Sequence, residues 1–412
     1  MDLSNAKICM IAHTFYDADG RVQRYAETLA STCRQVDVIC LRDGSQPLFK
    51  VKNGVRIFKI PFNHRSIKRS GYFIEYSIAF FLFSLWISAL FIKHRYHLIH
   101  VHNMPDFLVF TALLPKLFGA RLILDIHDAM PEIYLSKYRD SRKSLGLTFT
   151  RFQEVCSASF ADAVITANHL FKEAISRRGI PPEKITVVNN VAEGRIFDRA
   201  KHTRTLSEQN HSFTLMYVGT IAHRYGLEIP IRAMPTLIAQ IPDIRLIIIG
   251  SLRDGVKELP ALVDQLDVAS HVQFLPPLPF DEIPSQLAQA DVGIYTALSD
   301  PHMSIATPTK VLEYTAMGLP TIASRLPILE DLYKQGGIQF FEPGNPEDFA
   351  RSVIDLYLNP DKRADLIRTA DMSHPQNIAW DKERKAYLNL LRQLLGNDRG
   401  KNNRGSKKIS EE

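Results

Sequence analysis

Cysteine is scarce in this chain of 412 residues, and the scarcity narrows the class of protein. The four cysteines form no C-x-x-C pair, and three of them lie in apolar segments. This pattern is typical of a reduced cytosolic protein and argues against a secreted disulfide framework. A secretory signal is missing as well, because no basic start precedes a long apolar stretch. We therefore expect the first strand to begin the fold and the protein to be cytoplasmic.

A strong charge of one sign is also missing. The formal net charge is +6, the hydrophobic fraction is 45% and the charged fraction is 23%. These fractions are typical of a globular protein, and so small a basic excess does not predict nucleic acid as a partner. Because 412 residues exceed the size at which one hydrophobic core usually stops growing, we expect two domains.

Unbroken apolar runs alternate with helical patterns along the whole chain. Such runs, separated by helices, indicate parallel strands covered on both faces. Two sets of them predict an α/β protein with two doubly wound, Rossmann-like parallel sheets. The expected strands are Ile8–Ala12, Val36–Leu41, Val55–Ile60, Leu98–His102, Arg121–Ile126, Ala163–Thr166, Ile185–Val188, Thr214–Val218, Arg245–Ile249, Val272–Leu275, Val292–Tyr295 and Thr321–Ala323.

Polar stretches divide the chain. Residues 191–212 mark the expected seam between a first domain, residues 1–195, and a second domain, residues 206–375. A helix is expected over residues 376–396, where apolar side chains recur at helical spacing. The tail, residues 397–412, has nothing to bury and is expected to be disordered.

The segment Thr307–Ser324 is the most informative part of the sequence. Pro308 suits the start of a helix, and Gly318 followed by Pro320 suits its end. Backbone N–H groups at such a helix start bind phosphate well. Glu313 lies about one turn further along, where its carboxylate can accept hydrogen bonds from both hydroxyls of a ribose. Together these features predict a site for a nucleotide sugar.

This segment resembles the donor-binding helix of the retaining glycosyltransferases of family 4, which have the GT-B fold. The family's helix reads roughly Pro-x-Lys-x-x-Glu-x-x-Ala-x-Gly-x-Pro-Val-Ile-Ala. The matching residues are Pro308, Lys310, Glu313, Ala316, Gly318, Pro320, Ile322 and Ala323. The resemblance implies two Rossmann-like domains that face each other across a cleft. The donor contacts that it implies come from Thr307, Pro308, Thr309 and Glu313. Many family members carry a second glutamate at the donor sugar, where this chain has Ile305.

The end of the first strand carries a second match to this family. Asp19, Gly20, Arg21 and Val22 resemble the family's Asp-x-Arg-Val, which precedes its first helix. The loop follows the carboxyl end of a strand, where open α/β sheets bind ligands. By this resemblance, Gly20 would contact the donor. The acceptor side would be formed by His13, Asp19, Arg21, His102 and Asp128.

Residues 125–132 closely resemble a motif in family 4 enzymes that build bacterial polysaccharides. In the family its histidine faces the cleft near the donor sugar, which implies a catalytic role for His127. A lone histidine after a strand is otherwise more often structural. His100 and His102 point to one face of another strand, but no third ligand is apparent there. We therefore expect no metal site and no cofactor.

A loop in the second domain departs from the family. Residues 219–226 resemble Gly-Arg-x-x-x-x-Lys-Gly, whose two cations neutralise the departing diphosphate, but Thr220 and Tyr225 stand at the cation positions. Arg224 and Lys310 are the available cations, and we expect both to act in catalysis. Other residues expected near the donor are Gly219, Gly250 and Arg253.

Residues 73–92 form the most apolar stretch, with basic residues on both sides. Its length is near the minimum for a bilayer span. A span would separate strands of one domain, so we reject it. Two interpretations remain: a helix packed on the sheet, or the same helix with an aromatic face in a membrane interface. The second interpretation expects Phe80, Phe83 and Trp86 to face lipid.

The resemblance implies a retaining glycosyltransferase. It would move a sugar from a nucleoside diphosphate donor to a saccharide or lipid-linked acceptor in the synthesis of cell-surface polysaccharide or glycolipid. It would act without a metal, peripherally on the cytoplasmic face of the inner membrane. Two alternatives stay open: a sugar-nucleotide epimerase of similar fold, and a catalytically inactive, membrane-bound partner subunit. Donor hydrolysis without acceptor separates the inactive subunit from an enzyme.

Overall fold

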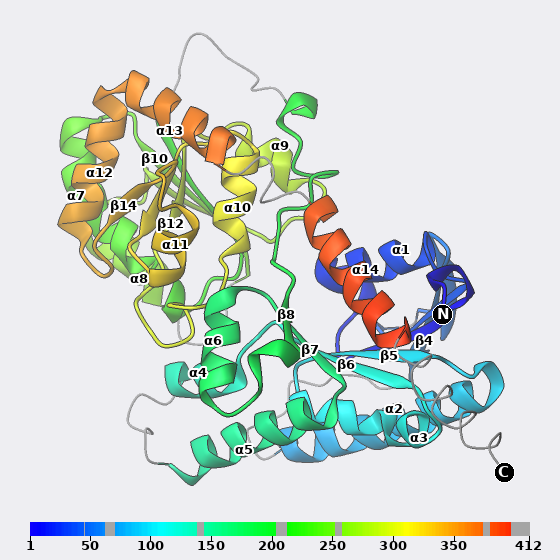
Figure 1. Ribbon diagram of the computed structural model, residues 1–412. Helices are drawn as coiled ribbons and strands as arrows, with labels where there is room; N and C mark the ends of the chain where they lie inside the picture. Colours follow the sequence, from blue (N-terminus) through cyan, green and yellow to red (C-terminus); the bar gives the residue numbers. More distant parts are fainter. Residues whose placement is uncertain are drawn as a thin grey trace, which may run out of the picture. The chain divides into compact units, whose positions relative to one another are not determined.

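The computed structural model contains two compact units, drawn in Figure 1. The first comprises Met1–Asn189 and the chain from Glu383 onward, and the second comprises Asn190–Lys382. The structure describes residues 1–44, 46–61, 71–137, 144–202, 212–251, 258–373 and 380–396. Arg253 and the tail expected to be disordered, residues 397–412, lie outside the described residues.

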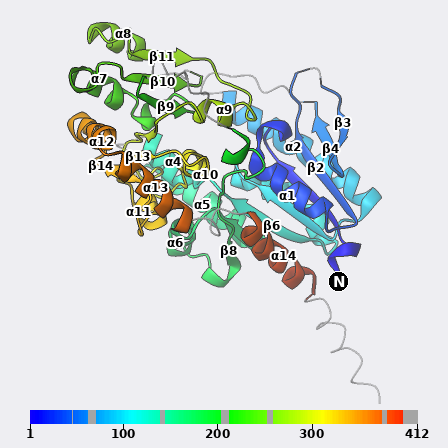
Figure 2. The same cartoon turned by 90° about the horizontal axis from the view of Figure 1, so that it is seen from above.

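The first unit is built on an eight-stranded sheet with the strand order β3-β4-β2-β1-β5-β6-β7-β8. Its strands are β1 (Lys7–Ala12), β2 (Gln35–Leu41), β3 (Phe49–Lys52), β4 (Val55–Ile60), β5 (Leu98–His102), β6 (Arg121–Ile126), β7 (Ala163–Thr166) and β8 (Ile185–Val187). Neighbouring strands run parallel except β3 and β4, which pair antiparallel at the edge seen in Figure 2. The expected parallel sheet therefore carries one additional antiparallel strand at this edge. Strand β3 has no apolar run, because its side chains alternate between exposed and half-buried positions.

Helices cover both faces of this sheet. They are α1 (Gly20–Ala30), α2 (Gly71–His94), α3 (Leu113–Leu117), α4 (Met130–Lys137), α5 (Leu145–Phe160), α6 (His169–Arg177) and α14 (Trp380–Gly396), with the 3-10 helix η3 at Asp106–Ala112. The late helix α14 packs into the first unit, where Tyr387 is fully buried against Tyr25 and His100. The amino group of Met1 also donates to the carbonyl of Leu395 at 3.1 Å.

The second unit contains a six-stranded parallel sheet with the order β11-β10-β9-β12-β13-β14. Its strands are β9 (Thr214–Val218), β10 (Arg245–Ile249), β11 (Val272–Leu275), β12 (Val292–Tyr295), β13 (Thr321–Ser324) and β14 (Gln339–Phe341). Its helices are α7 (Glu228–Gln240), α8 (Glu258–Gln265), α9 (Ile283–Leu287), α10 (Thr309–Ala316), α11 (Pro327–Leu332), α12 (Pro346–Leu358) and α13 (Pro360–Ser373). The 3-10 helix η6 spans His223–Tyr225. The apolar runs predict these strands except β14, which has three residues.

Helix α2 packs one side onto the sheet of the first unit. Ala79, Phe83, Ile87 and Phe91 recur at four-residue spacing and are at most 3% exposed, so this stripe belongs to the core. Trp86 is partly buried against the same core. The expectation that Phe83 faces lipid is therefore wrong, because it lies on the inward stripe. The outward residues of α2 are Ile74, Ile78, Phe81, Leu85 and Ile92.

By length and composition, Ile74–His94 is apolar enough to cross a membrane. Strand β4 before it and strand β5 after it nevertheless lie in the same sheet. A crossing would place these strands on opposite sides of a bilayer and break the sheet. Helix α2 is therefore part of the folded unit and not a span.

Candidate functional site

In the second unit, the carboxyl end of β9 lies beside the start of α10. Gly219 directly follows β9 and has a φ of 146°, a conformation that favours glycine. A Cβ on Gly219 would overlap Cε of Lys310. The lysine side chain can therefore pass directly over the backbone of residue 219 because this residue is a glycine. Gly250 follows β10, and a Cβ there would overlap the carbonyl of Gly219. The two glycines expected from the sequence thus make space at one edge of the sheet.

Lys310 lies over two aromatic rings. Its Nζ is 4.5 Å from the ring centroid of Tyr225 and 5.8 Å from that of Tyr217. A contact of this kind stabilises an ammonium by about 0.5–1 kcal/mol where it is exposed, and by more where water is excluded. Lys310 is half-buried. Tyr225, which stands at an expected cation position, therefore holds a cation and does not supply one.

Arg224 lies beside the same ring. Its Cζ is 6.0 Å from the ring centroid of Tyr225, and the side chain is exposed. The turn that carries it is fixed, because Leu298 N donates to the carbonyl of Arg224 and Thr296 Oγ1 donates to the carbonyl of Tyr225, both at 2.9 Å. The structure thus brings the two expected cations, Arg224 and Lys310, to one aromatic ring.

No side chain caps the amino end of α10. The helix begins at Thr309, and its N-cap is Pro308. The N–H of Val311 donates to the carbonyl of Pro308 at 3.0 Å. The N–H groups before it have no partner within the helix, and the helix dipole favours an anion at this end. Thr307, just before the helix, and Glu313, about one turn along it, are both half-buried. Gly318 ends the element in the left-handed conformation, with a φ of 68°.

In the first unit, Arg21 and Asp125 form a buried bidentate ion pair. Arg21 Nε donates to Asp125 Oδ2 at 2.9 Å, and Nη2 donates to Oδ1 at 2.8 Å. Arg21 Nη1 also donates to the carbonyl of Val188 at 3.1 Å. Burial raises the pKa of the Asp125 carboxyl, but the Arg21 guanidinium outweighs burial and holds this pKa well below its usual range. Arg21, which is expected on the acceptor side, therefore forms contacts that link α1 to β6 and to the end of β8.

Two buried histidines extend this cluster. His102 Nδ1 lies 3.0 Å from Asp125 Oδ2, and His100 Nδ1 lies 2.9 Å from the hydroxyl of Tyr387. Burial lowers the pKa of both imidazoles below the usual histidine range. Both rings are therefore neutral near pH 7, and His102 donates its Nδ1 proton to Asp125.

His100, His102 and Asp125 lie close enough together to hold a metal ion. The expectation that these two histidines lack a third ligand is therefore wrong, because Asp125 on the neighbouring strand β6 supplies one. Both oxygens of Asp125 nevertheless accept hydrogen bonds from Arg21. A guanidinium in contact with the carboxylate would repel a second cation, so this donor set does not suit a resident divalent ion.

His127 lies at the carboxyl end of β6, at the rim of the cluster. Its Nδ1 is 3.6 Å from Asp125 Oδ2, and its side chain is 19% exposed. Burial lowers the pKa of His127, but the carboxylates of Asp125 and Asp128 outweigh burial and raise this pKa above its usual value. His127 therefore carries a proton more readily than His102 does.

Asn103 follows β5 and holds the turn that contains His127. Its Oδ1 accepts hydrogen bonds from the backbone N of His127 at 3.2 Å and of Asp128 at 3.4 Å. Its Nδ2 donates to the carbonyl of Asp128 at 2.6 Å and to Asp106 Oδ1 at 2.9 Å. Neither Asn103 nor the role of Asp125 was expected from the sequence. One signal was present: a carboxylate within the apolar strand β6 must find a buried partner.

Three further expected residues of the first unit lie on or near α1 and α2. Asp19 caps α1, where its Oδ1 accepts a hydrogen bond from Val22 N at 3.0 Å. Gly20 opens α1, and the space beside it would admit a Cβ. The ring centroid of His13 lies 5.2 Å from that of Tyr76 on α2. Arg21, His102 and His127 are thus the expected residues that the structure gathers around Asp125.

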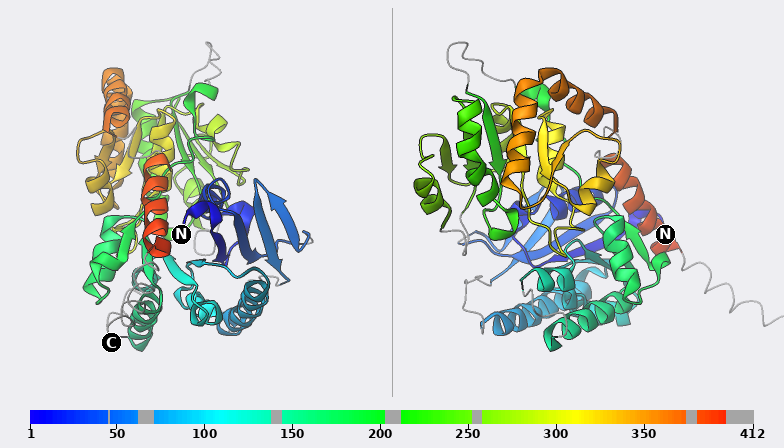
Figure 3. Two further views of the ribbon diagram at one scale, coloured as in Figure 1. Left: turned by 45° about the vertical axis from the view of Figure 1, so that its right-hand side comes forward. Right: turned by 90° about the vertical axis from the view of Figure 1, so that its left-hand side faces the viewer.

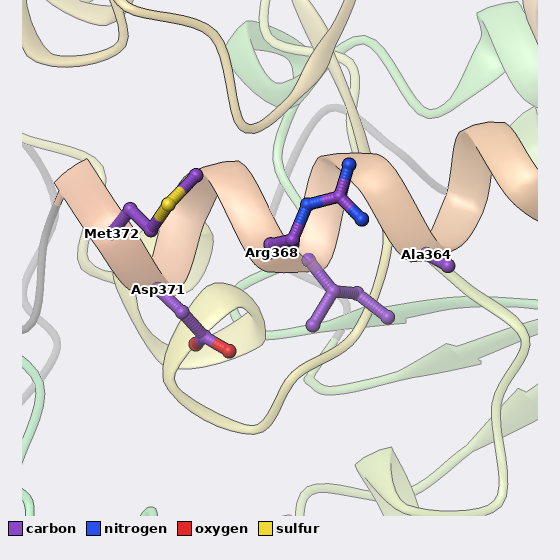
Figure 4. A pocket seen from close by; sticks show the side chains of 5 residues that line it. Ala364, Arg368, Asp371 and Met372 are labelled. Atoms are coloured by element: carbon purple, nitrogen blue, oxygen red, sulfur yellow. The ribbon is translucent and has the colours of Figure 1, made fainter.

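A shallow groove runs along α13 in the second unit (Figure 4). Its lining residues are Ala364, Ile367, Arg368, Asp371 and Met372. All of them belong to one helix, and none is an expected site residue. The groove therefore does not bear on the candidate site.

Two protein families match the chain. The "Glycosyl transferase 4-like domain" matches residues 19–191, and "Glycosyl transferases group 1" matches residues 198–372. The first match covers β-strands and helices of the first unit, and the second covers those of the second unit. Together they account for most of the chain.

Several known proteins are similar in sequence. An uncharacterised glycosyltransferase of Methanocaldococcus jannaschii is 24% identical over 381 residues, which are 89% of this chain and 92% of that protein. The D-inositol 3-phosphate glycosyltransferase of Acidothermus cellulolyticus is 28% identical over 257 residues; the match covers 58% of this chain and 56% of that protein. One subunit of the human phosphatidylinositol N-acetylglucosaminyltransferase is 20% identical over 382 residues, covering 90% of this chain and 71% of that protein.

Solved structures resemble the fold over nearly the whole chain. Sucrose-phosphate synthase of Thermosynechococcus elongatus superimposes with a TM-score of 0.77 at 18% identity, covering 95% of this chain and 100% of that chain. HepE of Anabaena in complex with UDP superimposes with a TM-score of 0.69 at 16% identity, and the match covers 94% of this chain and 100% of that chain. At such identities the likeness shows the fold, which is the GT-B fold of two parallel-sheet α/β domains.

Proposed function

The chain belongs to the glycosyltransferases of the family 4 type, and we propose that it is a retaining enzyme that uses a nucleoside diphosphate sugar. The observation that carries this proposal is the uncapped amino end of α10, with Lys310 in its first turn and Glu313 one turn along. A diphosphate on the helix N–H groups and the ammonium, with the ribose on the carboxylate, accounts for all three features. The UDP bound to HepE, which shares the fold, supports this class of ligand.

Cleavage of the donor develops negative charge on the departing diphosphate. A preorganised group aimed at such charge is worth about 10²–10³ in rate. Lys310, held over Tyr225, and Arg224, beside the same ring, would supply positive charge there together with the N–H groups of α10. These groups meet the charge requirement without a metal ion.

The transfer step retains the configuration of the sugar. The bond from the sugar to the diphosphate oxygen breaks, and the acceptor oxygen bonds to the sugar on the same face. The departing phosphate oxygen takes the proton of the acceptor hydroxyl, so no protein nucleophile is required. His127, whose raised pKa favours its protonated form, would act as a hydrogen-bond donor in the transfer, the role that the resemblance implies.

The acceptor is a saccharide, in our proposal one that is linked to lipid, for cell-surface polysaccharide or glycolipid. The enzyme would lie peripherally on the cytoplasmic face of the inner membrane. The outward apolar side chains of α2, such as Phe81 and Leu85, support this location. The name of the human relative, which includes phosphatidylinositol, supports a lipid acceptor.

A screen of donors tests the proposed function. Thermal melting of the purified chain should shift upward with one class among UDP-, GDP- and ADP-sugars, because a ligand that binds the native state stabilises it. That donor should then release its nucleoside diphosphate in the presence of EDTA. No melting shift with any of the three classes, or release that requires a divalent ion, would contradict the proposal.

The same assay separates the two alternatives. An inactive partner subunit, favoured by Thr220 and Tyr225 at the expected cation positions, would bind a donor without releasing a diphosphate. An epimerase of similar fold would release the diphosphate and convert the sugar without any acceptor. A retaining transferase would release it faster when a saccharide acceptor is added, with the sugar recovered on that acceptor.

A further inference from the structure

Helices α2, α3 and α5, labelled in Figure 1, cover one face of the sheet in the first unit, and Figure 3 shows the two longer ones, α2 and α5, from two further sides. The 3-10 helix η3 contacts all three of them and lies between α2 and α5. Their inward side chains enter one core, to which α2 contributes Phe83 and Phe91 and α5 contributes Ala158. The opposite sides of the three helices are therefore turned away from the sheet.

These outward sides are apolar. The apolar side chains on these outward sides are 45% to 89% exposed. They include most of the large apolar side chains that are exposed in the described part of the chain. They are Ile74, Ile78, Phe81, Leu85 and Ile92 on α2, Leu113, Leu117 and Phe118 on and just after α3, and Leu145, Phe149 and Phe152 on α5. We call these residues the apolar face. A concentration of exposed apolar side chains marks an interaction site.

The exposed charges on the described side chains of α2, α3 and α5 have one sign. Among the described side chains of α2, α3 and α5, the carboxylates are Glu75 and Glu154, which are 3% and 0% exposed. Glu154 is paired with Arg178 at 2.6 Å. Lys93 and Arg151 are exposed. The three helices thus offer basic groups and, on their described side chains, no exposed carboxylate, which matches an anionic partner.

We propose that the apolar face docks on an anionic lipid bilayer, with α2 and α5 lying in the plane of the interface. Apolar side chains on one face with lysine and arginine beside them are what an interfacial helix needs. Lys93 and Arg151 would then lie at the level of the lipid headgroups. The proposal rests on the proposed function and extends its membrane location from α2 to α3 and α5, and it explains how the enzyme reaches a lipid-linked acceptor.

A second copy of this chain fits the apolar face less well. A two-fold interface brings the same surface of both copies together. The basic groups Lys93 and Arg151 of one copy would then meet a surface that offers no exposed carboxylate on the described side chains of these helices. A bilayer that contains anionic lipid offers both the apolar interior and the opposite charge.

Sedimentation with vesicles tests the proposal on the full-length chain. The chain should pellet with vesicles of phosphatidylcholine and phosphatidylglycerol. Combining Phe81→Ser on α2 with Phe149→Ser on α5 should lower this partitioning at least about tenfold, because both rings leave the lipid. The matched control combines Leu358→Ser and Met372→Ser, which are 67% and 69% exposed in the second unit and should not change partitioning.

A charge variant separates the electrostatic part of binding. The double variant Lys93→Gln/Arg151→Gln should weaken binding to the vesicles with phosphatidylglycerol by about tenfold or more. Each basic group contributes several-fold near such a surface, and the two losses multiply. Binding to pure phosphatidylcholine should not change. High salt should reproduce the effect of the charge variant.

Crosslinking of the unmodified chain does not depend on any variant folding. A photoactivatable phosphatidylglycerol should label peptides from residues 74–92 and 145–152, and not peptides of α12. Label confined to other segments would overturn the proposal, and so would full partitioning of the folded Phe81→Ser/Phe149→Ser variant. Loss of a dimer in that variant, with no vesicle binding by the unmodified chain, would assign the face to a second copy. Diphosphate release without vesicles, measured in parallel, reports on the proposed transfer separately.

Discussion

The ammonium of Lys310 lies 4.5 Å from the ring centroid of Tyr225, a residue at a position where the resemblance to family 4 implies a cation. The relationship inverts the expected role of that position. Gly219 makes it possible, because any Cβ there would overlap the lysine side chain. The position of the Lys310 ammonium thus depends on the ring of Tyr225 and on the absence of a side chain at Gly219.

Replacing the ring tests this placement. Tyr225→Leu should lower turnover by about 2- to 30-fold, the range that corresponds to a cation–π contact of about 0.5–2 kcal/mol. Tyr225→Phe keeps the ring face and should stay close to the unmodified enzyme. The measurement is steady-state kinetics with the donor identified by the thermal screen. Equal losses in both variants would show that the hydroxyl, and not the ring, matters.

Glu313 is expected to bind the ribose of the donor. Glu313→Ala should weaken donor binding by about 1–3 kcal/mol, the size of a lost charge-assisted hydrogen bond. Isothermal titration measures the change. Glu330→Ala is the control, because that carboxylate forms an exposed ion pair with Arg325 in the same unit and should leave donor binding unchanged. Normal donor affinity in a folded Glu313→Ala variant would remove the ribose assignment.

Asp106 makes the stability of the first unit depend on pH. Burial, helped by the charge of Glu154, raises the pKa of this carboxyl to about 7 from a usual 3.8. The unfolded chain therefore loses the proton near pH 4, while the folded chain keeps it until about pH 7. Since the folded state binds more protons in this window, stability from this group falls as pH rises through it and levels off above it.

The variant Asp106→Asn removes this titration. Relative to the unmodified chain, it should gain stability steadily between about pH 4 and pH 7 and show a constant difference above that. Its total gain is on the order of a few kcal/mol, at about 1.4 kcal/mol for each unit of pKa change. Denaturant unfolding at a series of pH values gives the difference. A difference that does not vary with pH would mean that Asp106 is ionised in the folded state throughout.

The buried pair of Arg21 and Asp125 should be important for folding. Arg21→Met leaves the Asp125 carboxylate buried with its main partner removed, which typically costs about 3–5 kcal/mol. Adding Asp125→Leu should recover part of the loss, because the uncompensated charge is then gone. Denaturant unfolding of the single and double variants measures this. A single variant with unchanged stability would show that the pair is dispensable.

The sequence predicts the strands well because their apolar runs are unbroken and bounded by turn residues. The bounds of β4, β5, β6, β7, β9, β10, β11 and β12 agree with the expected runs. Helix α10 and its glycine stop also agree, since proline, glycine and the helical period all act locally. Strand β3 is not among the expected strands, because an edge strand with alternating exposure has no apolar run in the sequence.

The polar cluster of the first unit was only partly predictable. Arg21 and Asp125 are 104 residues apart, and no local pattern shows that they meet. The sequence also identifies a helix at α2 without showing which side is buried. A helix that is apolar on all sides has little helical asymmetry, so the sequence pattern does not show that Phe83 lies in the core.

Turnover of a Lys310 variant is the most direct test of whether the site at the amino end of α10 catalyses transfer from the donor. The unmodified chain should release the nucleoside diphosphate from its donor and pass the sugar to an acceptor with retained configuration. Lys310→Met keeps the length of the side chain without its charge, and it should lower turnover by about 10²-fold or more, the scale of one preorganised charge. The variant should still show a thermal shift with the donor, although a smaller one, because the N–H groups of α10 and Glu313 remain while the contact between the ammonium and the diphosphate is lost. Unchanged turnover in Lys310→Met, or an unmodified chain that binds every donor class yet releases no diphosphate, would contradict the assignment of this site to glycosyl transfer.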